Sequence, residues 1–224
     1  MSAGKPTLAL VGGTGDLGTG LALKWVAAGY PVIIGSRDAA RAAEAAGRLA
    51  PPVGAPAPRG LANAAAAAAA DVVVITVPFA SHDAILAEIR DAVAGKVVID
   101  ATVPLVPPKV ARVQLPPDDS AAVAAQKALG EAARVVSAFH NVAALKLQQG
   151  VPVDCDVLVF GDKPEDRAVA IRLAEAAGLR ALHAGPLANS AAAEALTSVL
   201  IGINRNYKVD GAGIRITGIP LAGG

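Results

Sequence analysis

The chain has 224 residues (22.1 kDa), enough for one α/β domain with a small addition and too few for a large multidomain assembly. It is 54% hydrophobic and 17% charged, so it can bury a core and lacks the composition of a disordered protein. The net charge of +1 and the few aromatic residues (one Trp, two Tyr and three Phe) exclude the basic surface and stacking platform typical of nucleic-acid binding.

Signals for a membrane, secretion or a metal are missing from the sequence. No stretch approaches the roughly 18 unbroken apolar residues of a spanning helix, and the first strand-like run begins too early for a secretion signal to precede it. A single cysteine, Cys155, excludes an internal disulfide, and His82, His140 and His183 are too scattered to form a metal site. We therefore expect a cytoplasmic protein that binds no metal, no membrane and no nucleic acid.

In the first half of the chain, apolar runs alternate with segments of helical spacing. The helical pattern that follows the first strand stops at Gly29, as at a helix C-terminus, and Ser81 is a suitable N-cap for a later helix. The expected strands are 7–11, 31–35, 71–77 and 96–100, and the expected helices are 17–28, 41–49, 64–70 and 81–89. Residues 51–58, which include four prolines, are predicted to cross the surface.

The second half begins with a proline-rich irregular segment, 104–117, which is followed by a helix. Further strands are expected at 134–139, 157–160 and 179–183, helices at 165–177 and 191–204, and a terminal strand near 214–216. Alternating strands and helices predict a Rossmann-type, doubly wound, mainly parallel sheet. We divide the chain into a Rossmann domain, 1–150, and a small C-terminal α/β lobe, 151–224.

A glycine motif joins the first strand to the first helix. Gly13, Gly15 and Gly18 match G-x-G-x-x-G, the turn that binds the pyrophosphate of a dinucleotide. In this interpretation Gly13 permits the tight turn, Gly15 lets the backbone approach the phosphates and Gly18 allows the helix to pack closely on the strand. Asp16 is expected to cap the turn, since a carboxylate that faces phosphates would repel them. A glycine-rich turn without a ligand is the alternative.

Ser36 and Arg37, which directly follow the second strand, favour NADP(H) over NAD(H). Ser36 and Arg37 stand where dinucleotide folds that prefer NAD have a carboxylate for the ribose 2′-hydroxyl. A hydroxyl and a guanidinium can bind the 2′-phosphate, and Arg41 lies one helical turn further on. The alternative is that Ser36 only caps the next helix while both arginines face solvent.

No residue set for ordinary carbonyl reduction is evident. Neither Tyr30 nor Tyr207 is followed by Lys four residues later, as short-chain reductases require, and no Ser/His/Asp set is convincing. The pattern favours hydride transfer between two bound redox cofactors, in which proximity and orientation supply most of the catalysis.

Five sequence blocks resemble the NADPH-dependent coenzyme F420 reductases, also called F420-dependent NADP oxidoreductases. The blocks follow the family order over nearly the whole chain and lie at 10–18, 35–37, 76–79, 135–140 and 184–190. The resemblance implies reversible hydride transfer between NADP(H) and the deazaflavin coenzyme F420 in a homodimer, with the C-terminal lobe contributing to the deazaflavin cleft.

The resemblance also implies which residues bind the cofactors. Those that contact the adenosine and phosphates are Thr14, Gly15, Asp16, Leu17, Ser36, Arg37 and Arg41, and those that line the crevice nearer the nicotinamide are Val77, Pro78, Phe79, Val103, Val142 and Ala144. Phe79 stands where the family is associated with Trp, and Asn141 where Thr is common, so the preferred acceptor is the property most affected.

His140 follows a predicted strand and is the candidate catalytic residue, since imidazole can donate and accept protons near neutral pH. An ordinary half-buried histidine is the alternative. Two other functions also remain open: an NADPH-dependent reductase of a flavin, metal chelate or other acceptor, and an NADP(H) sensor without turnover.

Overall fold

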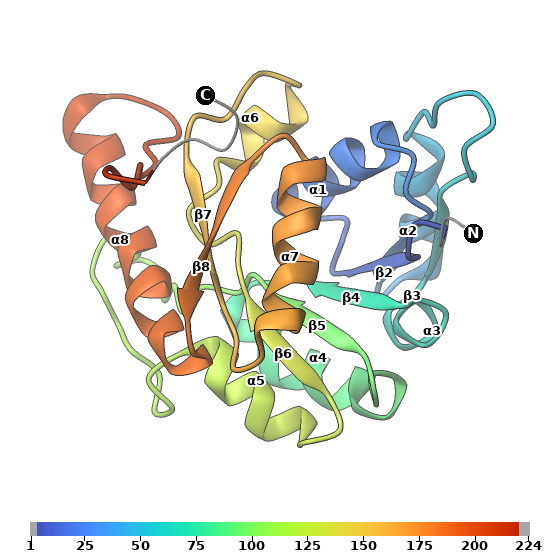
Figure 1. Cartoon of the computed structure of the whole chain (residues 1–224), viewed down its shortest axis with the longest axis horizontal. Helices are drawn as coiled ribbons and strands as arrows, with labels where there is room; N and C mark the ends of the chain where they lie inside the picture. The colour runs from blue at the N-terminus through green and yellow to red at the C-terminus, as the bar shows by residue number, and fades with distance from the viewer. Residues whose placement is uncertain (1–3, 220–224) are drawn as a thin grey trace.

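The computed structural model describes residues 4–219, which form one eight-stranded sheet in the order β3-β2-β1-β4-β5-β6-β7-β8 (Figure 1). All neighbouring strands are parallel except β6 and β7. The strands are β1 Leu8–Val11, β2 Val32–Ser36, β3 Arg59–Ala62, β4 Val72–Ile75, β5 Val97–Asp100, β6 Arg134–Ser137, β7 Asp156–Phe160 and β8 Arg180–Gly185. The strand order reverses between β1 and β4, which confirms the doubly wound Rossmann-type fold.

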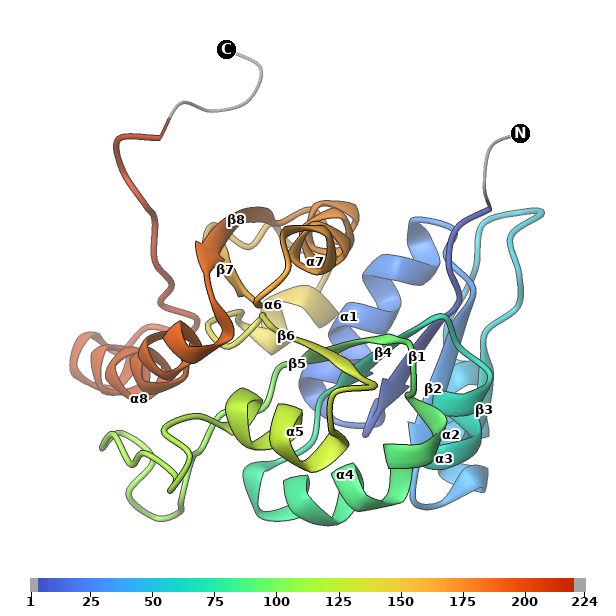
Figure 2. The same ribbon diagram turned by 60° about the horizontal axis from the view of Figure 1, so that its bottom comes forward.

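Helices cover both faces of the sheet (Figure 2). Residues of α1, α2 and α7 belong to one hydrophobic core, and residues of α3, α4 and α5 belong to the other. The longest helix, α8, packs against α5 beyond the sheet. The helices are α1 Asp16–Ala27, α2 Ala39–Gly47, α3 Asn63–Ala68, α4 His82–Ile89, α5 Ala121–Leu129, α6 Ala144–Gln148, α7 Pro164–Ala176 and α8 Ser190–Tyr207.

Successive side chains of the central strands enter opposite cores. In β1, Leu8 and Leu10 pack into the core that contains α1, whereas Ala9 and Val11 pack into the core that contains α4. All four residues are fully buried. A parallel strand covered by helices on both faces requires such a continuous apolar run, which explains why the strands could be recognised in the sequence.

Trp25 connects the first half of the chain to the second. Its ring is fully buried, and its Nε1 donates a hydrogen bond to the carbonyl oxygen of Leu173 in α7 over 2.7 Å. The ring meets the edge of Phe139 with centroids 6.0 Å apart. Both residues belong to the same core, so the loop after β6 is packed against α1.

The C-terminal segment does not form the strand expected at 214–216. It is held by Asp156 of β7 instead: the backbone N–H of Asp156 donates to the carbonyl oxygen of Ile214, and its carboxylate accepts from the N–H of Ile216. Arg180 and Arg215 bind the same carboxylate. Because a side chain takes part of the hydrogen bonding, no regular ladder develops.

Candidate functional site

The carboxyl ends of four strands lie side by side. Val11, Ile75, Asp100 and Ser137 are register partners across β1, β4, β5 and β6. The loops that follow these residues therefore share one edge of the sheet, at the point where the strand order reverses. In doubly wound folds this edge is where ligands bind.

The glycine turn after β1 is confirmed, and Gly12 is a further residue that it requires. The residue with positive φ (+73°) is Gly12, and a Cβ there would lie 2.4 Å from Val77 Cγ1. A Cβ on Gly13 would lie 2.7 Å from the carbonyl oxygen of Leu10, so Gly13 also permits the tight turn, as expected. Gly13 also packs against Gly18: a Cβ on Gly18 would lie 2.6 Å from the Cα of Gly13. A Cβ on Gly15 would lie 3.6 Å from the carbonyl oxygen of Gly12, an ordinary van der Waals contact, so the fold itself does not require glycine at this position.

The N-terminus of α1 is free of side-chain caps. Its N-cap is Gly15, and no side chain of the described residues accepts a capping hydrogen bond from the N–H groups of its first turn. The expectation that Asp16 caps the turn is wrong: Asp16 accepts from Gln148 Nε2, at 2.8 Å through its carbonyl oxygen and 3.4 Å through Oδ1. The first backbone N–H groups of α1 are thus available to an anion, which the helix dipole also favours.

Ser36 and Arg37 lie at the end of β2, as predicted. Asp38, and not Ser36, caps α2: its Oδ1 accepts from the N–H groups of Ala40 and Arg41. Among the described residues, Ser36 Oγ accepts only from the N–H of Asp38, at 3.2 Å. The guanidinium groups of Arg37 and Arg41 are exposed and line the same pocket as Ser36.

This pocket, of about 450 Å³, brings together three of the predicted sequence blocks. It lies between the glycine turn, the end of β2 and the start of α4. Its lining residues are Gly12, Thr14, Gly15, Ser36, Arg37, Asp38, Arg41, Thr76, Val77, Pro78, Ser81 and Ile85. Ser81 precedes α4 as expected, but its side chain makes no capping hydrogen bond.

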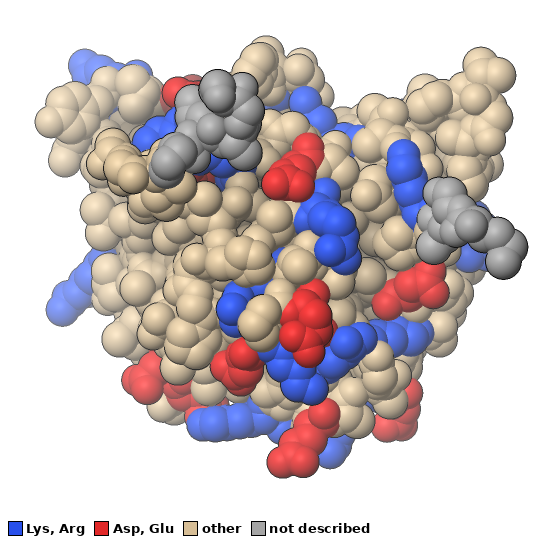
Figure 3. Space-filling model, in the orientation of Figure 1, with Lys and Arg blue, Asp and Glu red and all other residues tan. Residues whose placement is uncertain are grey.

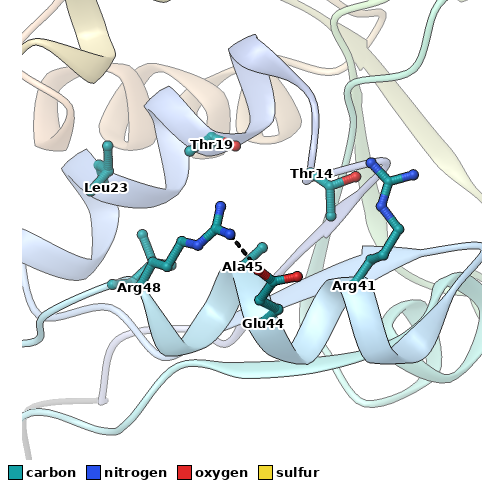
Figure 4. Close-up of a pocket in the computed structure, with 8 residues that line it drawn as sticks. Thr14, Thr19, Leu23, Arg41, Glu44, Ala45 and Arg48 are labelled. Atoms are coloured by element: carbon teal, nitrogen blue, oxygen red, sulfur yellow. Dashed lines mark hydrogen bonds and ion pairs between the residues drawn. The ribbon is translucent and has the colours of Figure 1, made fainter.

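A second hollow of about 380 Å³ lies between α1 and α2 and shares Thr14 and Arg41 with the first. Figure 4 shows the Arg41 side chain rising from α2 beside Thr14. It also shows Arg48 paired with Glu44 further along the same helix. Arg41 is therefore the arginine that reaches both hollows.

Asn63 supports the glycine turn and was missed in the sequence. Its Oδ1 accepts from the N–H of Gly12 at 3.3 Å, and its Nδ2 donates to Glu88 at 3.4 Å. Asn63 is 1% exposed and begins α3. It lies 51 residues from Gly12 in the chain, so no local pattern reveals the contact.

The other predicted crevice residues lie in separate loops along the same edge. Phe79 is half-buried in the turn before α4, and Val103 is half-buried after β5. Val142 lies with His140 in a hollow of about 160 Å³ that α8 and the C-terminal segment close. Ala144 begins α6, and its carbonyl oxygen packs close to Gly20 of α1.

His140 is held tightly after β6. It is 5% exposed, its Nε2 lies 2.8 Å from Ser137 Oγ, and its carbonyl oxygen accepts from Thr197 Oγ1. The preceding residue, Phe139, has φ +70°, a strained conformation for a large side chain, and its packing against Trp25 maintains it. Burial lowers the pKa of His140 to about 4, although the charge of Asp100 opposes the shift. The imidazole is therefore neutral at pH 7.

A further buried acid was not predicted. Glu194 of α8 is 1% exposed and accepts from the N–H groups of Ala121 and Ala122, at the N-terminus of α5. Burial raises the pKa of Glu194 to about 7, although these two hydrogen bonds lower it. The contact joins residues 73 positions apart, so no local pattern predicts it.

Comparison with known proteins agrees with this arrangement. The sequence profile of the family described as coenzyme F420-dependent NADP oxidoreductase matches residues 7–104. The F420-dependent NADP reductase of Methanothermobacter thermautotrophicus is 43% identical over 221 residues, which cover 95% of each chain. That of Methanocaldococcus jannaschii is 40% identical over 96% of this chain and 99% of its own.

The chain belongs to the coenzyme F420-dependent NADP oxidoreductase family.

The fold is also similar to that of a solved structure. A crystal structure of a candidate F420-dependent NADP reductase from Arthrobacter sp. FB24 has a TM-score of 0.77 and 25% identity, covering 95% of this chain and 99% of that one. The region matched by the family profile runs from β1 to the loop after β5, so it includes the glycine turn, Arg37 and Val103. His140 lies outside that region.

The surface of this family member carries no dominant charge on the face seen in Figure 3, where acidic and basic side chains are interspersed. None of the helices within residues 4–219 is both long and apolar enough to cross a membrane. Within the same residues, no group of three or more His, Cys, Asp or Glu side chains could hold a metal ion.

Proposed function

We propose that this oxidoreductase transfers a hydride reversibly between NADP(H) and coenzyme F420. Family membership supports the reaction. The observation that carries the nucleotide assignment is the pocket in which an uncapped helix N-terminus at Gly15 faces Ser36, Arg37 and Arg41. Phosphate groups need backbone N–H donors and guanidinium groups of this kind, and no carboxylate replaces Ser36 at the end of β2.

Each part of the pocket has a role in binding. The free N–H groups at the start of α1 hold the pyrophosphate, and Gly15 allows the backbone to approach it. Ser36 and Arg37 bind the 2′-phosphate, with Arg41 on a second side. Thr14, Asp16 and Leu17 complete the adenosine and phosphate contacts, while Gly13 and Gly18 shape the turn beneath them.

The residues nearer the nicotinamide act by placement and by excluding water. Val77, Pro78, Phe79 and Val103 line this part of the crevice, and Val142 and Ala144 extend it toward α6. Bound F420 supplies a ring carbon that takes the hydride and a ring nitrogen that takes a proton. The protein contributes mainly orientation, because two bound cofactors that are aligned react without a nucleophile from the chain.

His140 is the residue that contacts the acceptor. Because its pKa is about 4, the ring is neutral at pH 7 and keeps one proton. Ser137 occupies Nε2, while Nδ1 has no partner among residues 4–219. Nδ1 is itself buried, so the ring is not open to solvent, and His140 shapes the acceptor side of the cleft as a neutral group rather than serving as a charged acid.

Three broader assignments go with this function. Residues 1–150 form the NADP-binding domain and 151–224 the lobe that completes the deazaflavin cleft. The protein is a homodimer, supported by Val199, Ile203 and Tyr207, which are exposed at four-residue spacing on α8. It is located in the cytoplasm, where its single buried thiol at Cys155 stays reduced.

Acceptor competition tests the function. The purified protein is given NADPH with oxidised F420, riboflavin, FMN or a ferric chelate, and the loss of acceptor absorbance is followed. We expect rapid bleaching of F420 and slow or no reduction of the other acceptors. Reduction of a flavin or ferric chelate in preference to F420 would move the function to that acceptor, and tight NADPH binding without any turnover would indicate a sensor.

A further inference from the structure

A buried ion pair lies at the carboxyl end of β5. His82 Nε2 is 2.7 Å from Asp100 Oδ2, and the two side chains are 0% and 1% exposed. Burial alone lowers the pKa of His82, but the hydrogen bond and charge of Asp100 outweigh it and raise the pKa. Apolar residues of similar volume are often as stabilising as such a pair, or more so, so stability alone does not explain its presence here.

Asp100 binds two separate loops with its two oxygens. Oδ2 pairs with His82, the first residue of α4, which directly follows the turn Phe79–Ser81. Oδ1 accepts from the N–H of Thr102 at 2.9 Å, in the loop that continues to Val103. One carboxylate therefore fixes both the loop after β4 and the loop after β5.

The two loops carry crevice residues. The Phe79 ring stacks on the His82 imidazole, with centroids 6.3 Å apart and planes 29° apart, so the orientation of His82 sets that of Phe79. Val103 directly follows Thr102. The start of α4 also contributes Ser81 to the wall of the nucleotide pocket.

We propose that Asp100 and His82 are positioning residues for hydride transfer, because they fix the loops that present Phe79 and Val103 to the nicotinamide. The proposal rests on the proposed function. The observations that carry it are the two contacts of the Asp100 carboxylate, to His82 at 2.7 Å and to the N–H of Thr102 at 2.9 Å.

The test compares two Asp→Asn variants. Asp100→Asn removes the carboxylate of the pair, and the matched control Asp166→Asn removes a buried carboxylate that Arg134 binds at 2.8 Å, on α7. Three quantities are measured: amide hydrogen exchange in 77–82 and 101–105, binding of NADP⁺ and of adenosine 2′,5′-bisphosphate, and the single-turnover rate of F420 reduction.

For Asp100→Asn we expect faster exchange in both loops, weaker binding of NADP⁺ and unchanged binding of the bisphosphate, which lacks the nicotinamide. The single-turnover rate should fall on the order of 10- to 100-fold, as for a small misplacement of reacting groups. Asp166→Asn should match the wild type in all three quantities. The proposal is overturned if the two variants behave alike, or if Asp100→Asn weakens the bisphosphate as much as NADP⁺.

Asp100→Asn leaves the buried His82 without an ion-pair partner, which can prevent folding. In that case the double variant Asp100→Asn/His82→Gln, which removes both charges, is measured and judged by the same criteria. A wild type that fails to reduce F420 would contradict the proposed function. Loop exchange and bisphosphate binding would still report on the pair in that case.

Discussion

The buried neutral imidazole of His140 makes the stability of the protein depend on pH in a defined way. Its pKa is about 4 in the folded protein, against 6.5 in the unfolded chain. Between these values the unfolded chain binds a proton that the folded protein does not, so stability is lost as the pH falls from 6.5 toward 4. The linkage relation gives a loss of about 2 kcal/mol at pH 5 and about 3 kcal/mol at pH 4.

The perturbation that tests this is His140→Gln, which keeps a polar partner for Ser137 and has no proton to gain. Urea unfolding is measured between pH 7 and pH 4 for the wild type, for this variant and for the control His183→Gln, whose side chain is exposed on β8. Between pH 7 and pH 5, the free energy of unfolding of the wild type and of the control should fall by about 2 kcal/mol more than that of His140→Gln. Parallel curves for all three proteins would refute the neutral buried state of His140.

Three further changes test the nucleotide site and the C-terminal segment. Gly18→Ala should lower the free energy of unfolding by about 1–3 kcal/mol and weaken NADP⁺ binding, because its Cβ would lie 2.6 Å from the Cα of Gly13. The control Gly47→Ala has open space around it and should be neutral or slightly stabilising. Equal effects of the two substitutions would contradict the packing argument. Arg37→Ala should weaken NADP⁺ binding in calorimetry by about tenfold or more while NAD⁺ binding stays unchanged, and a loss shared by both nucleotides would remove Arg37 from the 2′-phosphate site. Asp156→Asn should expose the segment after α8 to limited proteolysis, because the amide loses the charge that binds Arg180 and Arg215 beside Ile216, and an unchanged cleavage pattern would show that other contacts suffice.

The sequence predicted those parts of the fold and site that depend on local patterns. The buried strands are continuous apolar runs, and the glycine turn has fixed spacing, so β1, α1 and the positions of Ser36 and Arg37 could be found directly. The strand expected at 214–216 failed because the carboxylate of Asp156, far away in the chain, takes the N–H of Ile216. A local apolar pattern contains no information on such a competitor.

The supporting residues of the site could not be predicted for a similar reason. Asn63 reaches Gly12 across 51 positions, and Glu194 reaches Ala121 across 73. His82 and Asp100 are only 18 positions apart, but their contact depends on the pairing of β4 with β5, which places the end of one strand beside the loop after the other. These contacts follow from sheet order, and sheet order is decided by the whole chain.

The central claim is that the hydride passes directly between two cofactors bound in one cleft. The most direct test uses NADPH deuterated at C4, prepared separately with the label on each face of the nicotinamide, and locates the deuterium in reduced F420 by mass spectrometry and NMR. We expect one of the two labelled forms to deliver its deuterium to the ring carbon of F420 without loss to water. Deuterium released to solvent from both forms, or NADPH oxidation without label in F420, would contradict direct transfer in this cleft.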